Sequence, residues 1–188
     1  MSSTIPSTHD GHAPVMDWPT FASAYQFEDT VFRLTTESLR LLGESAFQDE
    51  VFSAFAFNVS LPSVSLSFDT LPDNKEQEYY PPDWSNECME VDVPAIGQLW
   101  EQGYGKIADA LGDLIDKVDD ELLDAIDEGC LHSLRKVMIR LETSQAFASI
   151  NTAARFWTLV TQVDADTDEE ERLLDEVRQA ATGAQLAG

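Results

Sequence analysis

The sequence predicts an α+β fold: a small, mainly antiparallel β-sheet of about three or more strands, packed against several α-helices. Two kinds of hydrophobic pattern support this prediction. Residues 60–68 alternate apolar residues with serines, which is the period of a half-buried strand. Residues 27–43 and 106–128 carry apolar residues at intervals of three and four, which is the period of a helix. A chain of 188 residues is long enough to bury the core of one such domain.

The composition divides the chain into a leading segment, one domain and a short tail. Residues 1–16 are rich in Ser, Thr, Pro and His, and we expect this segment to be flexible. Residues 17–182 hold the periodic patterns and form the predicted domain. Residues 183–188 follow the last pattern, and we expect them to be frayed.

Two helices are predicted at the start of the domain. Trp18, Phe21 and Tyr25 recur at spacings of three and four, and Pro19 falls where a first helical turn tolerates proline. Residues 27–43 then form an amphipathic helix, for which Gly43 is a natural C-terminal stop.

Two strands follow, over residues 51–58 and 60–68. A short link that contains Pro62 joins them, which favours a β-hairpin with proline at the turn or at the start of the strand. The serines that alternate with Val64, Leu66 and Phe68 are expected on the outer face of this hairpin.

The stretch Tyr79-Tyr80-Pro81-Pro82-Asp83-Trp84 stands where the strand pattern gives way to the helical pattern. Its two prolines restrict the backbone and its three aromatic rings favour burial. We therefore expect a rigid corner whose rings serve the core and which fixes the following helices against the sheet.

The second half of the chain is predicted to contain long helices, one strand and a last helix. The first helix opens near Pro94, with Gly103 and Gly105 loosening it locally. It ends near Lys117 or continues into a second helix, which reaches Gly129 and resumes over residues 131–141. Residues 154–163 are rich in β-branched and aromatic residues and favour a strand. Thr167 and Glu170 match a capping box for a helix to about Ala181.

Charge is the outlying property of this sequence. It has 35 Asp and Glu against 11 Lys and Arg, a net charge of −24, and the excess is present in every quarter of the chain. This excess repels nucleic-acid phosphates and anionic membrane surfaces, so neither is expected as a partner. Three explanations of the acidic excess stay open: attraction of a basic protein partner, solubility, and adaptation to high salt.

An aspartate ladder lies within residues 106–128, beside an apolar helical stripe that runs from Ile107 to Ile126. If one continuous helix spans the segment, these carboxylates form a line with neighbours roughly 5–6 Å apart. Such a line would contact Lys and Arg of a partner; the alternative is a solvated face, with Asp119 or Asp120 capping a break between two helices. We assign partner binding to the ladder, to one acid of the aromatic corner and to one acid just after it. The assigned residues are Asp109, Asp113, Asp116, Asp120, Asp124, Asp127, Asp83 and Glu87.

No catalytic, cofactor or metal site is predicted, and the protein is not expected to be an enzyme. His9 and His12 have a metal-compatible spacing but lack further ligands nearby. Asp164, Asp166 and Asp168 begin like a calcium loop, but the pattern lacks the glycine and the final glutamate that such a loop needs, and an acidic helix-capping turn is the better interpretation. His132 is isolated in a helical segment.

The two cysteines, Cys88 and Cys130, are far apart and show no ligand spacing. They indicate reduced thiols in the cytoplasm, although two cysteines could form one bridge. Residues 1–14 have neither a basic residue nor an apolar run, which is unlike a secretion signal, and cytoplasmic localisation is expected.

Several segments between residues 25 and 175 resemble a bacterial family of uncharacterised domains encoded beside polymorphic or secreted toxins. They are the aromatic strand over residues 51–57, the strand end Ser67-Phe68-Asp69-Thr70 and the Trp-bearing segment over residues 82–87. The resemblance implies an immunity protein, which binds and blocks a cognate toxin. It transfers no site residue, because immunity families share no single set of functional residues.

The sequence thus predicts a non-enzymatic inhibitor of a basic toxin, most naturally a nuclease with a cationic groove. An intracellular adaptor or chaperone-like module for a basic partner is the alternative from a second class, and an unrecognised hydrolase is a third. The oligomeric state is left open.

Overall fold

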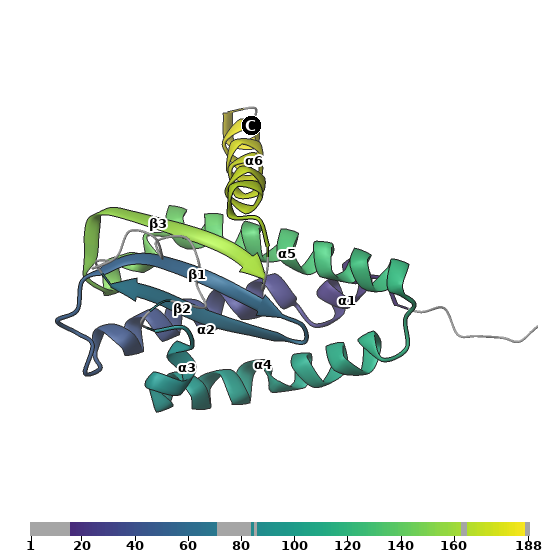
Figure 1. Cartoon of the computed structure of the whole chain (residues 1–188), viewed down its shortest axis with the longest axis horizontal. Helices are drawn as coiled ribbons and strands as arrows, with labels where there is room; N and C mark the ends of the chain where they lie inside the picture. Colours follow the sequence, from purple (N-terminus) through teal and green to yellow (C-terminus); the bar gives the residue numbers. More distant parts are fainter. Residues whose placement is uncertain (1–15, 71–83, 85, 163–164, 187–188) are drawn as a thin grey trace, which may run out of the picture.

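A computed structural model describes residues 16–70, 84, 86–162 and 165–186, with side chains to residue 183 (Figure 1). Its helices and one small sheet pack together, which confirms the predicted α+β class. The elements, in chain order, are α1 Trp18–Ala24, α2 Phe27–Gly43, β1 Phe52–Ser60, β2 Ser63–Thr70, α3 Met89–Asp92, α4 Pro94–Ile115, α5 Asp120–Thr143, the 3-10 helix η3 Ala146–Ser149, β3 Thr152–Gln162 and α6 Thr167–Leu186.

The sheet has the strand order β2-β1-β3 and is mixed. β1 and β2 form the predicted antiparallel hairpin, with Phe57 opposite Leu66. β3 pairs with β1 in parallel, with Phe57 opposite Val160, so only one of the two pairings is antiparallel. The reason is the connection: the chain passes through α3, α4 and α5 between β2 and β3, and such a long helical crossover allows a parallel return.

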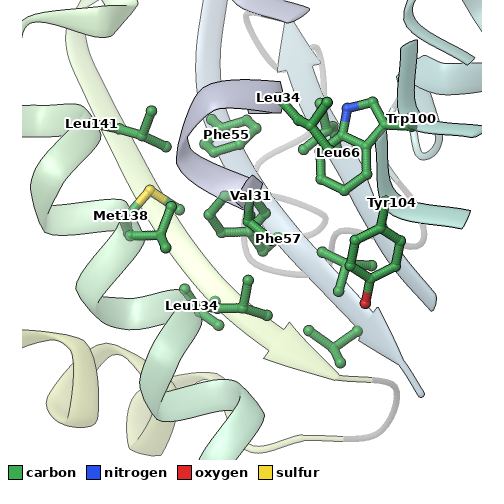
Figure 2. Close-up of a cluster of buried hydrophobic side chains, with 14 of the residues drawn as sticks. Val31, Leu34, Phe55, Phe57, Leu66, Trp100, Tyr104, Leu134, Met138 and Leu141 are labelled. Carbon is green, nitrogen blue, oxygen red and sulfur yellow. The ribbon is translucent and has the colours of Figure 1, made fainter. Parts of the chain in front are cut away.

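The main core lies between one face of the sheet and the helices α2, α4 and α5 (Figure 1). Figure 2 shows Phe55 and Phe57 of β1 directed toward side chains of α2 and α5, such as Leu34 and Met138. Gly103 does not loosen α4, which is continuous; a Cβ there would lie 2.5 Å from Leu34 Cδ2. This glycine therefore lets α4 approach α2 closely.

Trp84 packs on the opposite face of the sheet. Its side chain is buried with Ala54, Ala56 and Leu159, and its ring stands edge-on to Trp157 at 5.4 Å between centroids. We expected the corner to fix the helices against the sheet. Trp84 instead packs on the face away from these helices, because its neighbours Ala54 and Ala56 alternate along β1 with the phenylalanines that face the helices. The other five residues of the corner, 79–83, lie outside the described residues.

Ser67 pairs with Ala56 and so lies on the outer face of the hairpin, as predicted, but it is not exposed there. It is fully buried, and its hydroxyl donates to the carbonyl oxygen of Glu87 at 2.6 Å. The chain bridges back to β2 at this point, where Phe68 and Asn86 exchange backbone hydrogen bonds. This return covers the outer edge of the hairpin.

Of the two courses left open near Lys117, the structure has the break: α4 ends at Ile115, and the Asp119 carboxylate accepts the N–H of Leu122 to cap α5. Two other helix boundaries differ from the prediction. α5 passes through Gly129 without a break, because intrahelical hydrogen bonds and tertiary packing tolerate a helical glycine. α6 continues to Leu186, past both the predicted end and the start of the expected frayed tail.

Only part of the N-terminal region for which predictions were made lies among the described residues. Residues 1–15, with His9 and His12, lie outside the described residues. α1 begins as expected, with proline in its first turn, and the structure adds Asp17 as its N-cap. Cys88 and Cys130 are both free thiols.

Candidate partner-binding site

Residues 109–128, which we call the acidic hairpin, form the end of α4, the turn and the first half of α5. They hold nine acidic residues and a single cation, Lys117. All of the nine are exposed except Asp127, which is half-buried. Within the described part of the chain none of them forms an ion pair. The nine are Asp109, Asp113, Asp116, Asp119, Asp120, Glu121, Asp124, Asp127 and Glu128.

Other acidic stretches of the surface are compensated by arginines. Arg40 pairs with Glu37 and Glu44 on α2. Arg172 pairs with Glu169 and Glu176 on α6 in the same way. Among the described residues, the acidic hairpin is thus a dense run of carboxylates that no cation of the chain pairs with.

The predicted ladder is not a single row, because the helix that would carry it is interrupted. Asp109 and Asp113 lie on α4, and Asp116 is its C-cap. Asp120 and Asp124 lie on α5, which runs back in the opposite direction (Figure 1). The six carboxylates therefore lie on two helices that run in opposite directions, instead of along one helix.

Asp83, the acid assigned in the corner, lies outside the described residues. Glu87 is exposed and follows the bridge between Phe68 and Asn86 at the far end of β2. The acidic hairpin lies at the other end of the molecule, beside the β1–β2 turn, where Gly112 approaches Pro62 (Figure 1). The structure does not bring Glu87 together with the ladder.

A groove of about 1470 Å³ adjoins the acidic hairpin. Its floor is α5 from Asp124 to Lys136, one wall is α1 with the start of α2, and the other wall is α6. The apolar part of the lining comes from all three sides. It includes Trp18, Ala22, Leu131, Leu173, Val177 and Ala181.

The charge of the groove changes along its length. At the hairpin end, Asp124, Asp127 and Glu128 line it without ion pairs within the described residues. Burial, and then the nearby Asp124 carboxylate, raise the pKa of Asp127 above its ordinary value. At the other end, Lys136 pairs with Glu28 at 3.3 Å, so its charge is already compensated. The unpaired negative charge thus lies at one end.

The α1 wall is fixed to α5 by a close approach. The indole N–H of Trp18 donates to Ser133 Oγ at 3.0 Å in a buried site. A Cβ at position 129 would lie 2.5 Å from the Trp18 ring, so only glycine lets the indole lie this close to α5. Gly129, read from the sequence as a helix break, is in fact a contact residue.

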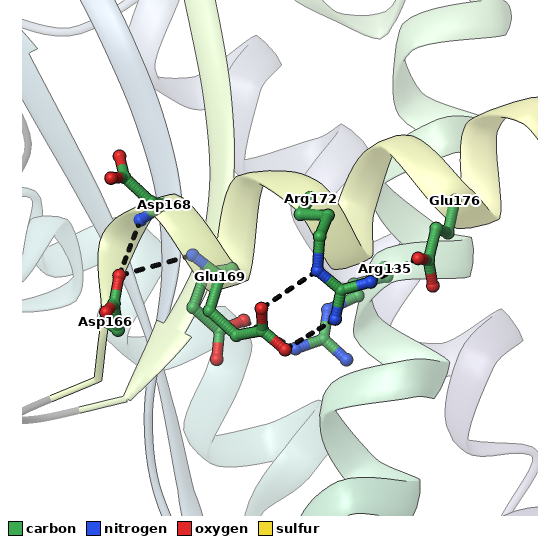
Figure 3. Close-up of polar contacts among 7 residues, drawn as sticks. Arg135, Asp166, Asp168, Glu169, Arg172 and Glu176 are labelled. Atoms are coloured by element: carbon green, nitrogen blue, oxygen red, sulfur yellow. Dashed lines mark hydrogen bonds and ion pairs between the residues drawn. The ribbon is translucent and has the colours of Figure 1, made fainter.

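The α6 wall is held at its first half, and the helix then projects from the body (Figure 1). The Asp166 carboxylate accepts the N–H groups of Asp168 and Glu169 and caps the helix, as Figure 3 shows. Glu170 was predicted to complete a capping box; instead it is buried and binds Arg135 of α5. The acidic helix-capping turn is confirmed for Asp166, while Asp164 lies outside the described residues.

Sequence reasoning missed both walls of the groove. The signal on α6 was present: Leu173, Val177, Ala180 and Ala181 recur at helical spacing. A periodicity of this kind indicates an apolar helix face. It does not indicate whether that face packs into a core or lines an open groove.

The remaining candidate residues are not brought together into a site. His132 is largely exposed on the groove floor, where partial desolvation and then the charges of Lys136 and Arg135 lower its pKa. The thiol of Cys88 donates to Glu90 Oε2 at 3.3 Å, and burial and then the Glu90 carboxylate raise the pKa of this thiol, which keeps it protonated. Among the described residues, no group of three or more His, Cys, Asp or Glu is placed to hold a metal ion.

Comparison of the chain with protein-family models, with curated proteins and with solved structures finds no match. The resemblance to toxin-associated domains therefore stays a prediction. Over the part of the chain that the structure describes, no helix has both the length and the apolar character needed to traverse a bilayer.

Proposed function

We propose that this protein is a non-enzymatic acidic binding protein that neutralises a basic protein partner, as an immunity protein neutralises a toxin in the cytoplasm of the producing cell. The observation that carries the proposal is the acidic hairpin, with nine carboxylates, one lysine and no ion pair within the described residues. Carboxylates that form no ion pair within the chain can bind a partner's Lys and Arg without first breaking a pair of their own.

Two physical effects support this role. A concentrated negative patch accelerates encounter with a cationic surface, and it repels competing nucleic acid. The like charges of the hairpin also oppose its own folding, so the arrangement is a local cost that a cationic partner would offset. A nuclease is the natural toxin class, because the groove that binds its substrate's phosphates is itself cationic.

The proposal is tested by co-expressing the chain with the product of the adjacent gene and measuring growth rescue and co-purification. The informative variant is D109N/D113N/D116N/D120N. Its matched control, D49N/E50Q/D92N/E101Q, removes four exposed carboxylates that also lack ion pairs within the described residues.

The hairpin variant is expected to weaken the complex and flatten its salt dependence, while the control retains both. An adaptor would co-purify with its partner without rescuing growth. Failure of the wild-type chain both to rescue and to co-purify would refute the proposal.

A further inference from the structure

The groove between α1, α5 and α6 has the dimensions of a helix-binding site. Its floor extends over residues 124–136, which is ~18 Å at 1.5 Å per residue. A helix of that length and ~10 Å diameter occupies on the order of 1400 Å³. The groove measures about 1470 Å³, above the range of roughly 300–1,000 Å³ that is typical of small-molecule sites.

The lining of the groove has apolar surface between its two walls and negative charge at one end. Leu173 and Val177 on α6 and Ala22 on α1 are half-buried, so each leaves apolar surface available between the two walls. Asp124 and Glu128 are exposed at the hairpin end of the same floor. An occupant therefore needs an apolar stripe along its length and cations at one end.

The chain itself offers no such occupant. Its segments outside the described residues contain one basic residue, Lys75, and residues 1–15 contain none. A second copy is disfavoured too, because each copy carries a net charge of −24 and the two would repel. The chemistry of the groove instead matches a cationic partner.

We infer that the groove binds an amphipathic α-helix of a basic partner protein, with the partner's Lys and Arg over Asp124, Asp127 and Glu128 and its apolar stripe against Leu173 and Val177. The inference rests on the proposed function and gives it a binding mode. Recognition of this kind reads apolar anchors at i, i+3, i+4 and i+7 of the bound helix. The charged end sets the direction in which the helix lies.

The test uses two peptides of one composition, each of Leu, Ala and Lys and about four helical turns long at 3.6 residues per turn. One peptide places its leucines on a single helical face and its lysines toward one end; the other has the same residues scrambled. Affinity for the full chain is measured by fluorescence anisotropy at low and at physiological salt. The amphipathic peptide is expected to bind at least about tenfold more tightly.

Two pairs of variants locate the binding. A125R/A180R adds two cations at exposed positions of the groove, and its control A95R/A148R adds two at exposed positions on α4 and η3. D124N/D127N/E128Q removes the charged end of the groove, and its control D109N/D113N/D116N removes three acids of the same hairpin outside it. Both groove variants are expected to lower the affinity for the amphipathic peptide by about tenfold or more. The control variants are expected to lower it by about twofold at most.

Each outcome bears on whether the cationic helix binds in the groove. Equal binding of both peptides, with equal losses in D124N/D127N/E128Q and in its control, would overturn the groove and leave the proposed acidic binding function standing. Absence of peptide binding would also overturn the groove, whereas the proposed function depends on rescue and co-purification. A concentration-dependent dimer that A125R/A180R abolishes would show that a second copy occupies the groove, and would overturn the inference as well.

Discussion

Arg135 of α5 and Glu170 of α6 form a buried ion pair, with 2.5 Å between Nη2 and Oε2 and side chains only 5% and 8% exposed. The pair joins the helix that forms the groove floor to the helix that forms one wall. Arg135 Nε is buried without an acceptor among the described residues, so the pair is not fully compensated. α6 is also tied by Arg178, which binds Glu142 of α5 at 2.8 Å.

Replacing one partner of this pair is expected to be more damaging than replacing both. Arg135→Met or Glu170→Leu leaves a buried charge alone, which costs about 3–5 kcal/mol. The double variant R135M/E170L removes both charges and is expected to regain most of that loss, because well-packed apolar residues often replace a buried pair at no net cost. Urea unfolding of the three variants measures this; a double variant as unstable as the sum of the singles would contradict it.

Trp84 is expected to act on stability rather than on recognition. Trp84→Ala removes a buried indole from Ala54, Ala56 and Trp157 and should cost about 3–5 kcal/mol. Trp84→Phe keeps an aromatic ring and loses an indole N–H that has no partner among the described residues, so it should cost much less. Unfolding midpoints and partner affinity are measured on both variants. Intact stability with lost binding in Trp84→Ala would reverse this assignment.

Glu90 should make stability depend on pH in the opposite sense to a salt-bridged carboxylate. Its carboxylate accepts the N–H of Leu66 on the edge of β2 at 2.8 Å, and burial raises the pKa of this carboxyl above its ordinary 4.5. The folded state therefore holds the proton more tightly than the unfolded state does. Ionised Glu90 destabilises the fold above the raised pKa, and this penalty disappears as the pH falls through that pKa toward 4.5.

Glu90→Gln keeps an acceptor for Leu66 and has no charge to bury. It is expected to raise the urea midpoint at pH 7 and to lose this advantage gradually as the pH is lowered, since wild-type Glu90 then becomes neutral. The exposed Glu101→Gln serves as the control. An advantage of Glu90→Gln that is independent of pH would show that burial of charge at this position is not the cause.

The acidic hairpin should lower stability at low salt. In D109N/D113N/D116N/D120N the like-charge neighbours at i,i+3 and i,i+4 on α4 are removed, so its Tm should exceed that of the wild type. The difference should shrink toward zero at 1 M salt, where the Debye length is about 3 Å. The control D49N/E50Q/D92N/E101Q should gain less, because its carboxylates are spread over the chain. An equal gain in the two variants would mean that net charge, not the hairpin, is responsible.

Local patterns were sufficient for the longer elements, but not for the short helices α3 and η3. The helix over residues 27–43, the hairpin around Pro62 and the strand near residues 154–163 all form close to where periodicity and β-branched content place them. Glycine was the least predictable residue. Gly103 and Gly129 looked like weak points in helices, yet both lie where another element approaches too closely for a Cβ.

The sequence by itself determined the α+β class, the hairpin and the concentration of acidic residues within 109–128, because each is set by residues close together in the chain. Tertiary structure alone decided the parallel pairing of β3, the direction in which the second half of the ladder runs back after the capped break, and the groove beside it. The physical reason is that these depend on which faces of distant elements meet. Arg135 and Glu170 are 35 positions apart, and no local pattern in either helix specifies that the two side chains share a buried site.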